Sequence, residues 1–188
     1  MKNNKVLLIV VGLLAAGVIY GFTAYNGLVS KEAEVESQWA TVESKLQRRY
    51  DLIPNLVNSV QGSMEQEKEV FGNITEARSK MAGANTVKET AEASTEMEAA
   101  LSRLLVVMEN YPEIKSNENV QTLMTQLEGT ENRISVERDR YNKAVKKYNV
   151  STKRFPSSLI ASMTGFESKD YFEADEGAAK VPEVNFNK

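Results

Sequence analysis

The side chains that most often carry out acid–base and metal chemistry are missing from this sequence. The 188 residues contain no histidine and no cysteine. Histidine is the side chain best suited to proton transfer near neutral pH and is the commonest metal ligand. A thiolate nucleophile, a disulfide or a lipid attached through sulfur requires cysteine. The sequence therefore predicts no catalytic residue, no bound metal and no cofactor, and it argues against an enzyme.

Two groups of charged and amide side chains remain as candidates for a site. Their members are Arg48, Arg49, Asp51, Asn55, Glu131, Asn132 and Arg133. A binding or catalytic pocket is one interpretation. We favour a structural network of ion pairs and amides between helices, because a buried charge needs a partner and no acid pair or base of recognisable catalytic spacing accompanies the group.

Basic residues are concentrated between positions 133 and 154, where eight Lys and Arg stand against two acidic residues, a local excess of +6. A solvated helix face, whose cations offset the helix dipole, is one interpretation. The other is contact with anionic lipid headgroups, which attract such clusters at about 1 kcal/mol per residue. The residues that would then face lipid are Lys143, Lys146, Lys147, Lys153 and Arg154, with apolar support from Leu159, Ile160, Met163 and Phe166.

These charges must be positioned by the elements around them, and the clearest element is an apolar segment at residues 6–25. It reads VLLIVVGLLAAGVIYGFTAY and has no charge. Twenty residues of helix span about 30 Å, the thickness of a hydrocarbon core. A cleaved signal peptide is the alternative, but its apolar region is usually shorter, and Phe22 stands where a cleavage site ending at Ala24 would need a small residue. We predict a retained single transmembrane helix.

The charges that flank this span predict its orientation. Lys2 and Lys5 precede it, whereas Lys31 is followed by three nearby glutamates. The positive-inside rule places residues 1–5 in the cytoplasm and the following domain in the periplasm or outside the cell. Without the two N-terminal lysines the chain has 21 basic and 26 acidic residues, a net charge of −5, so no nucleic-acid partner is expected.

Small residues recur four positions apart within the span, at Gly12 and Ala16 and at Gly17 and Gly21. Such pairs let two membrane helices approach closely, which would favour a homo-oligomer. Glycine and alanine are common in membrane helices, so incidental spacing is the interpretation we favour.

Helical spacing of apolar residues continues after the span. A coiled-coil-like stripe predicts a first helix; it consists of Leu28, Val35, Trp39, Val42 and Leu46. Asp51 suits an N-cap and Pro54 a first helical turn, so a second helix is predicted to begin there and to end at Gly83.

Two further helices are predicted, over about 86–109 and from 116 or 117 almost to Pro156. The predicted fold is all-α: a single N-terminal transmembrane helix that continues into an antiparallel bundle of about four long helices over residues 26–166. From Glu173 onward the chain is small, charged and aperiodic, and we expect residues 167–188 to form a disordered C-terminal tail.

Several segments, in order along the chain, resemble the LemA family. They are YNGLV at 25–29, KLQRRYDLIPNLV at 45–57, EAR at 76–78, YPEIKSNENV at 111–120, LEGTENRI at 127–134, RYNKAVKKYN at 140–149 and FPSSLIA at 155–161. The resemblance implies a membrane anchor, a helical bundle and no established enzymatic activity. It also implies themes of envelope maintenance or membrane organisation, since similar proteins are often encoded beside membrane zinc proteases of the HtpX type and a related protein helps to build magnetosome membranes.

Two functional hypotheses follow. The first is a non-enzymatic envelope protein of the cell membrane that acts as an oligomerising scaffold, with membrane lipids and further copies of itself as partners. The alternative is an adaptor or regulator of a membrane protease of the HtpX type.

Overall fold

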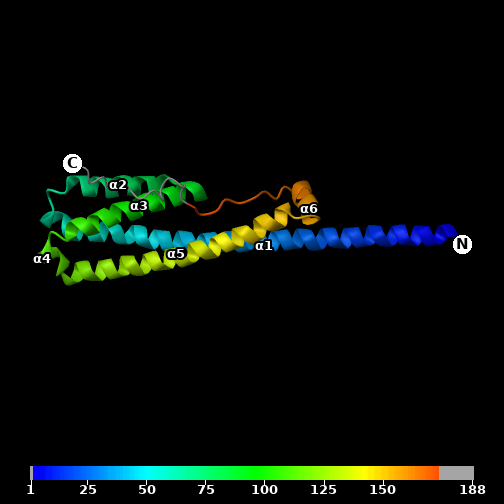
Figure 1. Cartoon of the computed structure of the whole chain (residues 1–188), viewed down its shortest axis with the longest axis horizontal. Coiled ribbons are helices and arrows are strands. Elements are labelled where there is room, and N and C mark those ends of the chain that lie inside the picture. Colours follow the sequence, from blue (N-terminus) through cyan, green and yellow to red (C-terminus); the bar gives the residue numbers. More distant parts are fainter. Residues whose placement is uncertain (1, 174–188) are drawn as a thin grey trace, which may run out of the picture. The chain divides into compact units, whose positions relative to one another are not determined.

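The computed structural model describes the backbone of residues 2–173 and the side chains of residues 7–173. The elements are α1 (Lys2–Val60), the 3-10 helix η1 (Gln61–Ser63), α2 (Lys68–Gly83), α3 (Val87–Met108), α4 (Pro112–Lys115), α5 (Glu118–Lys153) and α6 (Ser157–Thr164) (Figure 1). No strand occurs in residues 2–173. The predicted all-α fold with a long apolar N-terminal helix is therefore confirmed.

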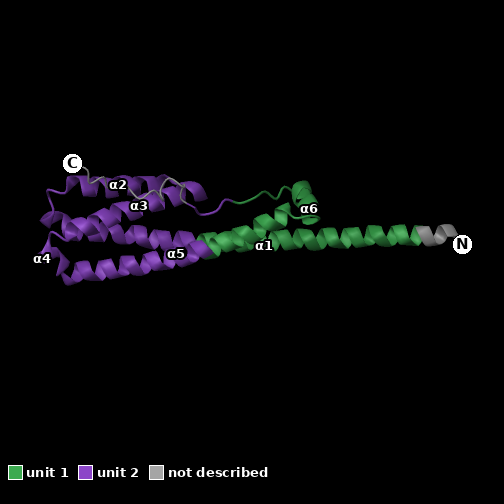
Figure 2. Cartoon of the chain, viewed as in Figure 1, with its two compact units in different colours: residues 1–40, 140–169 green, residues 41–139, 170–188 purple. Residues whose placement is uncertain are grey.

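The chain divides into two compact units (Figure 2). Unit 1 consists of residues 1–40 and 140–169, and so holds the first part of α1, the end of α5 and α6. Unit 2 consists of residues 41–139 and 170–188; its described part holds the end of α1, helices α2 to α4 and the start of α5. Helices α1 and α5 each contribute to both units.

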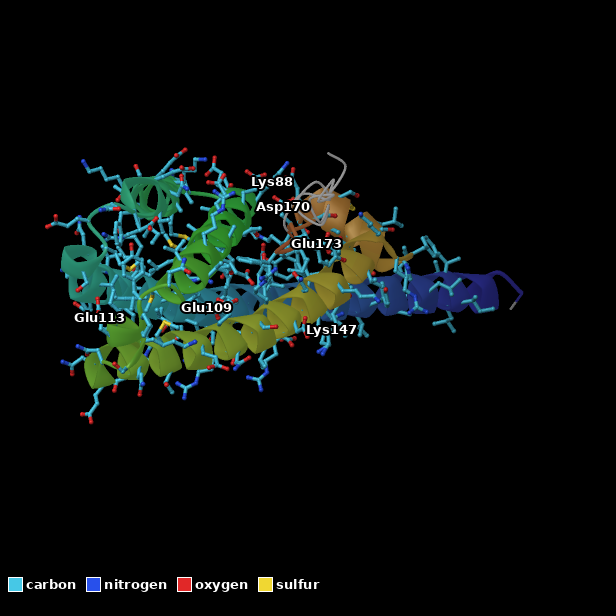
Figure 3. All side chains as sticks on the ribbon, turned by 60° about the vertical axis from the view of Figure 1, so that its left-hand side comes forward. Lys88, Glu109, Glu113, Lys147, Asp170 and Glu173 are labelled. Carbon is cyan, nitrogen blue, oxygen red and sulfur yellow. The ribbon has the colours of Figure 1, made fainter. Side chains whose placement is uncertain are left out.

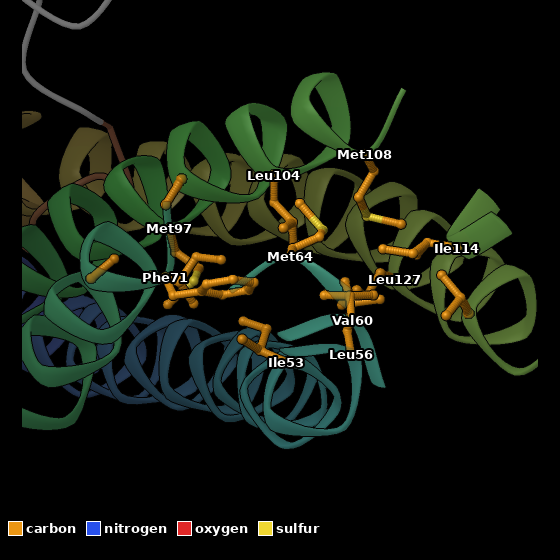
Figure 4. Close-up of a cluster of buried hydrophobic side chains, with 14 residues drawn as sticks. Ile53, Leu56, Val60, Met64, Phe71, Met97, Leu104, Met108, Ile114 and Leu127 are labelled. Carbon is orange, nitrogen blue, oxygen red and sulfur yellow. The ribbon is translucent and has the colours of Figure 1, made fainter. Parts of the chain in front are cut away.

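Unit 2 is built on one cluster of buried apolar side chains (Figure 4). The cluster consists of Ile53, Leu56, Val60, Met64, Phe71, Ile74, Ala77, Met97, Ala100, Leu104, Met108, Ile114, Val120 and Leu127. Helices α1, α2 and α3 contribute apolar residues three or four positions apart, and α4 and α5 add Ile114, Val120 and Leu127. This burial gives the short helices α2 and α4 the tertiary support that they would lack alone.

The predicted break between a first and a second helix at Asp51 and Pro54 is wrong. Helix α1 runs without interruption to Val60, with Pro54 inside it. A proline inside a helix costs about 3 kcal/mol, because it cannot donate to the carbonyl four residues earlier. Continuing the helix buries Ile53, Leu56 and Val60 completely, which contributes roughly 1.5–3 kcal/mol for each side chain. Burial outweighs the proline, and α1 ends where Gly62 follows.

The predicted second helix is also interrupted, because the 3-10 helix η1 and a turn separate Val60 from Lys68, whereas the remaining predicted ends agree with the structure. Helix α2 ends at Gly83, as expected. Helix α3 begins after Thr86, whose hydroxyl accepts a hydrogen bond from the Glu89 N–H at 3.1 Å, while the Glu89 carboxylate accepts one from the Thr86 N–H at 3.1 Å. This reciprocal pair is a capping box, a strong local signal for a helix start.

In unit 1, α1 and the end of α5 pack through a short apolar seam. Leu28 and Val35 of α1 are buried, as are Val145 and Tyr148 of α5. The half-buried ring of Trp39 lies against Tyr141, with the ring centroids 5.3 Å apart. Trp39 was expected on this buried stripe, and it lies at its edge.

The segment expected to begin a disordered tail is packed over its described part. In unit 2 the ring of Phe172 is buried and lies 4.7 Å beneath the Arg138 guanidinium carbon. Asp170 and Glu173 lie near Lys88, at the start of α3 (Figure 3). The prediction is therefore wrong for residues 167–173, because a buried aromatic side chain holds the segment; residues 174–188 lie outside the described residues.

The continuity of α1 can be tested at its proline. Replacing Pro54 with Ala should raise the free energy of unfolding by about 1–2 kcal/mol, since an alanine N–H can donate to the Tyr50 carbonyl. The measurement is chemical denaturation of the full chain in detergent, with unfolding monitored by the circular dichroism signal of the helices.

Pro112 supplies the matched control, because it occupies the first turn of α4, where its missing N–H costs nothing. Pro112→Ala should be neutral or slightly destabilising. If Pro54→Ala behaved in the same way, Pro54 would stand at a helix start and the continuous α1 would be wrong.

Candidate functional site

The first part of α1 presents a large apolar surface that no other described residue covers. Leu8 is 71% exposed, Leu14 65% and Phe22 69%. The segment is long and apolar enough to cross a membrane, and none of its most apolar stretch is buried within the structure. Soluble proteins rarely leave a contiguous apolar surface of this size in water. The segment therefore has the character of a membrane span.

Helix α6 packs beside the end of this span (Figure 2). Gly165 ends α6 in a left-handed conformation, φ +79°, which glycine adopts without strain. The turn lets the Phe166 N–H donate to the Ala161 carbonyl at 3.0 Å and brings the Phe166 ring to 5.7 Å from Tyr25. A second contact with α1 is made by Ile160, whose Cδ1 would lie 3.8 Å from a Cβ added at Gly21.

Pairs between α1 and α5 show how far the predicted lipid-facing residues lie from the span. Lys31 Nζ donates to Ser151 Oγ at 2.6 Å, and Lys147 Nζ lies 3.3 Å from the Glu34 carboxylate. At 1.5 Å rise per residue, Glu34 is about 14 Å beyond Tyr25 along α1. Lys147 is exposed on the outside of α5 (Figure 3).

The five predicted lipid-facing residues therefore divide into two sets. Lys153 and Arg154 are exposed and follow Ser151, so they lie nearest to the end of the span. Lys143, Lys146 and Lys147 lie farther along α5, where the Debye length of about 8 Å at physiological salt leaves little attraction to a membrane surface.

A polar clamp in unit 1 escaped prediction from the sequence. The Asn149 side chain donates to the Lys169 carbonyl at 2.8 Å and accepts from the Lys169 N–H at 2.9 Å. The Lys169 ammonium lies 2.7 Å from the Glu32 carboxylate. Asn149 stands in the RYNKAVKKYN segment, but its partner is twenty residues later and carries no motif. The clamp holds the chain beyond α6 against α1 and α5.

The pH dependence of the clamp follows from Lys169. The hydrogen bond to Glu32 raises the pKa of the Lys169 ammonium above its ordinary value of 10.5, against the opposing effect of partial burial. Because folding raises the pKa of this basic group, the ion pair between Lys169 and Glu32 adds to the free energy of unfolding at neutral pH. That contribution is lost as the pH rises from 10.5 past the folded-state pKa of Lys169. The Lys169 ammonium is therefore charged and paired with Glu32 at neutral pH.

In unit 2 the predicted polar network is reduced to one ion pair and its hydroxyl partner. Arg49 is 2% exposed; its Nη1 donates to Glu131 Oε2 at 2.5 Å and its Nη2 to Ser94 Oγ at 2.6 Å. The guanidinium thereby links α1, α3 and α5. A buried cation satisfied in this way fixes how the helices align, which is the structural role that the sequence favoured.

The other predicted members of the network do not join it. Arg48, Asn55, Asn132 and Arg133 are exposed, and Asp51 accepts a hydrogen bond from Gln47 Nε2 at 2.8 Å on the surface of α1. The prediction is wrong for Arg48, Asp51 and Asn55 because the turn between two helices around which it grouped them does not form, and it is wrong for Asn132 and Arg133 because they lie on the exposed face of α5. In the continuous α1 only one position per turn points inward, and Arg49 occupies it.

Beside this ion pair lies a cleft of about 350 Å³. Its lining residues are Arg49, Leu56, Glu98, Leu101, Ser102, Leu105, Met124, Thr125, Leu127, Glu128 and Glu131. Ser94 nearby accepts a hydrogen bond from the Arg49 guanidinium at 2.6 Å, so its hydroxyl takes part in holding the buried cation. Among the described residues no group of three Asp or Glu side chains is arranged to hold a metal ion.

Comparison with known proteins settles the family. A family model described as LemA family matches residues 38–186, well over half of the chain. The chain belongs to the LemA family. The matched region begins in α1 after the apolar span. It includes all of unit 2 that the structure describes, together with residues 38–40 and 140–169 of unit 1.

Two kinds of relative are similar to this LemA-family chain. Magnetosome proteins MamQ 1 and MamQ 2 of Paramagnetospirillum magneticum are each 27% identical over 175 residues, which cover 79% of this chain and 64% of each relative. Protein LemA of Metamycoplasma hominis is 21% identical over 176 residues, 92% of this chain and 80% of that protein. The chain thus spans less than two thirds of the magnetosome proteins that it matches.

The Arg49 pair can be tested by a double-mutant cycle. Glu131→Gln should lower the free energy of unfolding by about 2–3 kcal/mol, at the low end for a broken buried pair because the Glu131 side chain is 34% exposed. Arg49→Met combined with Glu131→Met should cost less than the sum of the two single changes. Asp139→Asn, exposed on the same helix and outside the cleft, is the control. Strictly additive losses would mean that the pair contributes nothing.

The Asn149 clamp predicts a local effect. Asn149→Ala removes two hydrogen bonds worth about 1 kcal/mol each, so the Lys169 amide should exchange its hydrogen on the order of 30-fold faster. Hydrogen–deuterium exchange of the full chain measures this. Asn132→Ala, on the exposed face of α5, should leave that amide unchanged, and equal exchange in both variants would show that the clamp does not hold the segment.

Proposed function

We propose that this LemA-family chain is a single-pass membrane protein without enzymatic activity, and that it acts as a scaffold whose copies associate and organise membrane or partner proteins. The observation that carries the proposal is the uncovered apolar surface of α1 between Leu7 and Phe22. An apolar surface of this length is stable in a bilayer and costly in water. The charge pattern of the flanks supports a cytoplasmic N-terminus and a helical domain on the other side of the cell membrane.

The chemistry of the domain supports a non-enzymatic role. The sequence has neither histidine nor cysteine. The buried ion pair of the predicted polar network, between Arg49 and Glu131, has a structural role because Arg49 also binds Ser94 and so joins three helices. The relatives named as magnetosome proteins support a role in organising a membrane structure. In this role the chain binds membrane lipids and other proteins through its surface and its span, and it requires no cofactor.

Self-association is assigned to the small residues of the span. A Cβ at Gly12 or Gly17 would meet nothing within 4 Å, and Ala16 is exposed. Gly21 differs, because Ile160 of α6 approaches it. The pair Gly12 and Ala16 therefore offers the more open face to a second copy, since helices in membranes approach most closely at small residues.

The size of the particle in lipid nanodiscs tests the proposal. We expect particles with more than one copy of the chain, and a lower copy number for Gly12→Ile with Ala16→Ile, because two branched side chains keep the helices apart. Leu14→Ile, on another face, is the matched control.

An exclusively monomeric particle would remove the self-associating scaffold. Crosslinking in native membranes addresses the alternative function: an adduct with a membrane zinc protease, without adducts between copies, would favour the adaptor over the scaffold.

A further inference from the structure

Helix α6 carries an apolar face that no described residue covers. Phe155, just before the helix, is 75% exposed, Leu159 is 55% exposed and Met163 is 82% exposed. Leu159 and Met163 are four residues apart in α6 and so share one face; together with Phe155, which precedes the helix, they make up an exposed apolar stripe. The opposite face is already used, since Ala161 is buried and Ile160 packs toward α1. An eight-residue helix that is apolar on both sides needs a second apolar environment.

The contacts of α6 place it at a defined depth along α1. Ile160 approaches Gly21, and the Phe166 ring lies against Tyr25. Gly21 and Tyr25 belong to the last turns of the twenty-residue apolar span. Aromatic residues at the end of a span mark the interface between hydrocarbon and headgroups. If α1 spans the bilayer, α6 must lie in that interface, and the environment of its uncovered face is lipid.

The charges next to the stripe fit the same environment. Lys153 and Arg154 are exposed and come directly before Phe155. The nearest carboxylates of α1 have other partners: Glu32 binds Lys169 at 2.7 Å, and Glu34 binds Lys147 at 3.3 Å. Two cations beside an apolar stripe match the phosphate groups that lie directly above lipid chains.

We infer that residues 153–163 form an interfacial lipid-binding site. The side chains of Phe155, Leu159 and Met163 insert among the lipid chains, and Lys153 and Arg154 bind the phosphates of anionic headgroups. The inference rests on the membrane span and not on self-association, so either can fail alone.

Single-cysteine labelling of the full chain tests the insertion, and the absence of natural cysteines makes every label unique. A polarity-sensitive fluorophore at Met163→Cys or Leu159→Cys should show blue-shifted emission in proteoliposomes and be quenched by lipids with a nitroxide on the upper acyl chain. Ala40→Cys, exposed in unit 1 and about 22 Å beyond Tyr25 along α1, is the control and should show neither effect.

Two results would overturn the insertion. Quenching of the Met163 label by aqueous iodide, and not by the nitroxide lipid, would place α6 in water. Protection from both quenchers would mean that protein, such as a second copy, covers the stripe. In either case the nanodisc copy number and the protection of the span itself report separately on the proposed function.

The headgroup contact is tested by charge removal in vesicles with and without phosphatidylglycerol. In a Leu159→Ser background, which weakens docking so that its equilibrium can be measured, Lys153→Gln with Arg154→Gln should lower the docked-to-undocked ratio of the Met163 label about fivefold per charge. The loss should appear in anionic vesicles and not in phosphatidylcholine.

Lys143→Gln with Lys146→Gln is the matched control, because it removes the same charge from the same helix farther from the span. It should leave the ratio unchanged. An equal loss from both pairs, or a loss from Lys153 and Arg154 that is the same in phosphatidylcholine, would overturn specific binding of anionic headgroups.

Discussion

The uncovered apolar surface at the start of α1 is the constraint on which the rest of unit 1 depends. Twenty residues without a charge match a hydrocarbon environment about 30 Å thick, and the described residues leave all but the end of this segment uncovered. Once this segment lies in lipid, the depth of every group packed on α1 follows from the rise of the helix. The ring of Phe166 against Tyr25 then lies at the interface, and the pair between Lys147 and Glu34 lies in water.

The same reasoning separates residues that look alike in the sequence. Lys143 and Arg154 belong to one basic run, yet the antiparallel packing of α5 on α1 puts Arg154 nearer to the end of the span. Screening makes this difference decisive, because attraction to a charged surface falls off within about 8 Å at physiological salt. The clamp between Asn149 and Lys169 adds to the arrangement by fixing the chain beyond α6.

Unit 2 shows how burial overrides local signals. Asp51 and Pro54 together form a good helix start, and the sequence predicted one there. The three buried side chains of Ile53, Leu56 and Val60 stabilise a continuous helix by more than the proline costs. That continuity turns Arg49 inward to Glu131 and Ser94 and leaves its charged neighbours outside.

The sequence by itself determined the all-α fold, the apolar span, the C-terminal end of α2, both ends of α3, and the LemA resemblance. These depend on local composition, on helical periodicity and on caps such as Thr86, which neighbouring residues decide. Only the tertiary structure decided that Arg49 alone of its group is buried, that Lys169 meets Asn149 and Glu32, and that α6 lies beside Gly21. Each of these joins residues far apart in the chain, and their partners are chosen by packing between helices, which no local pattern records.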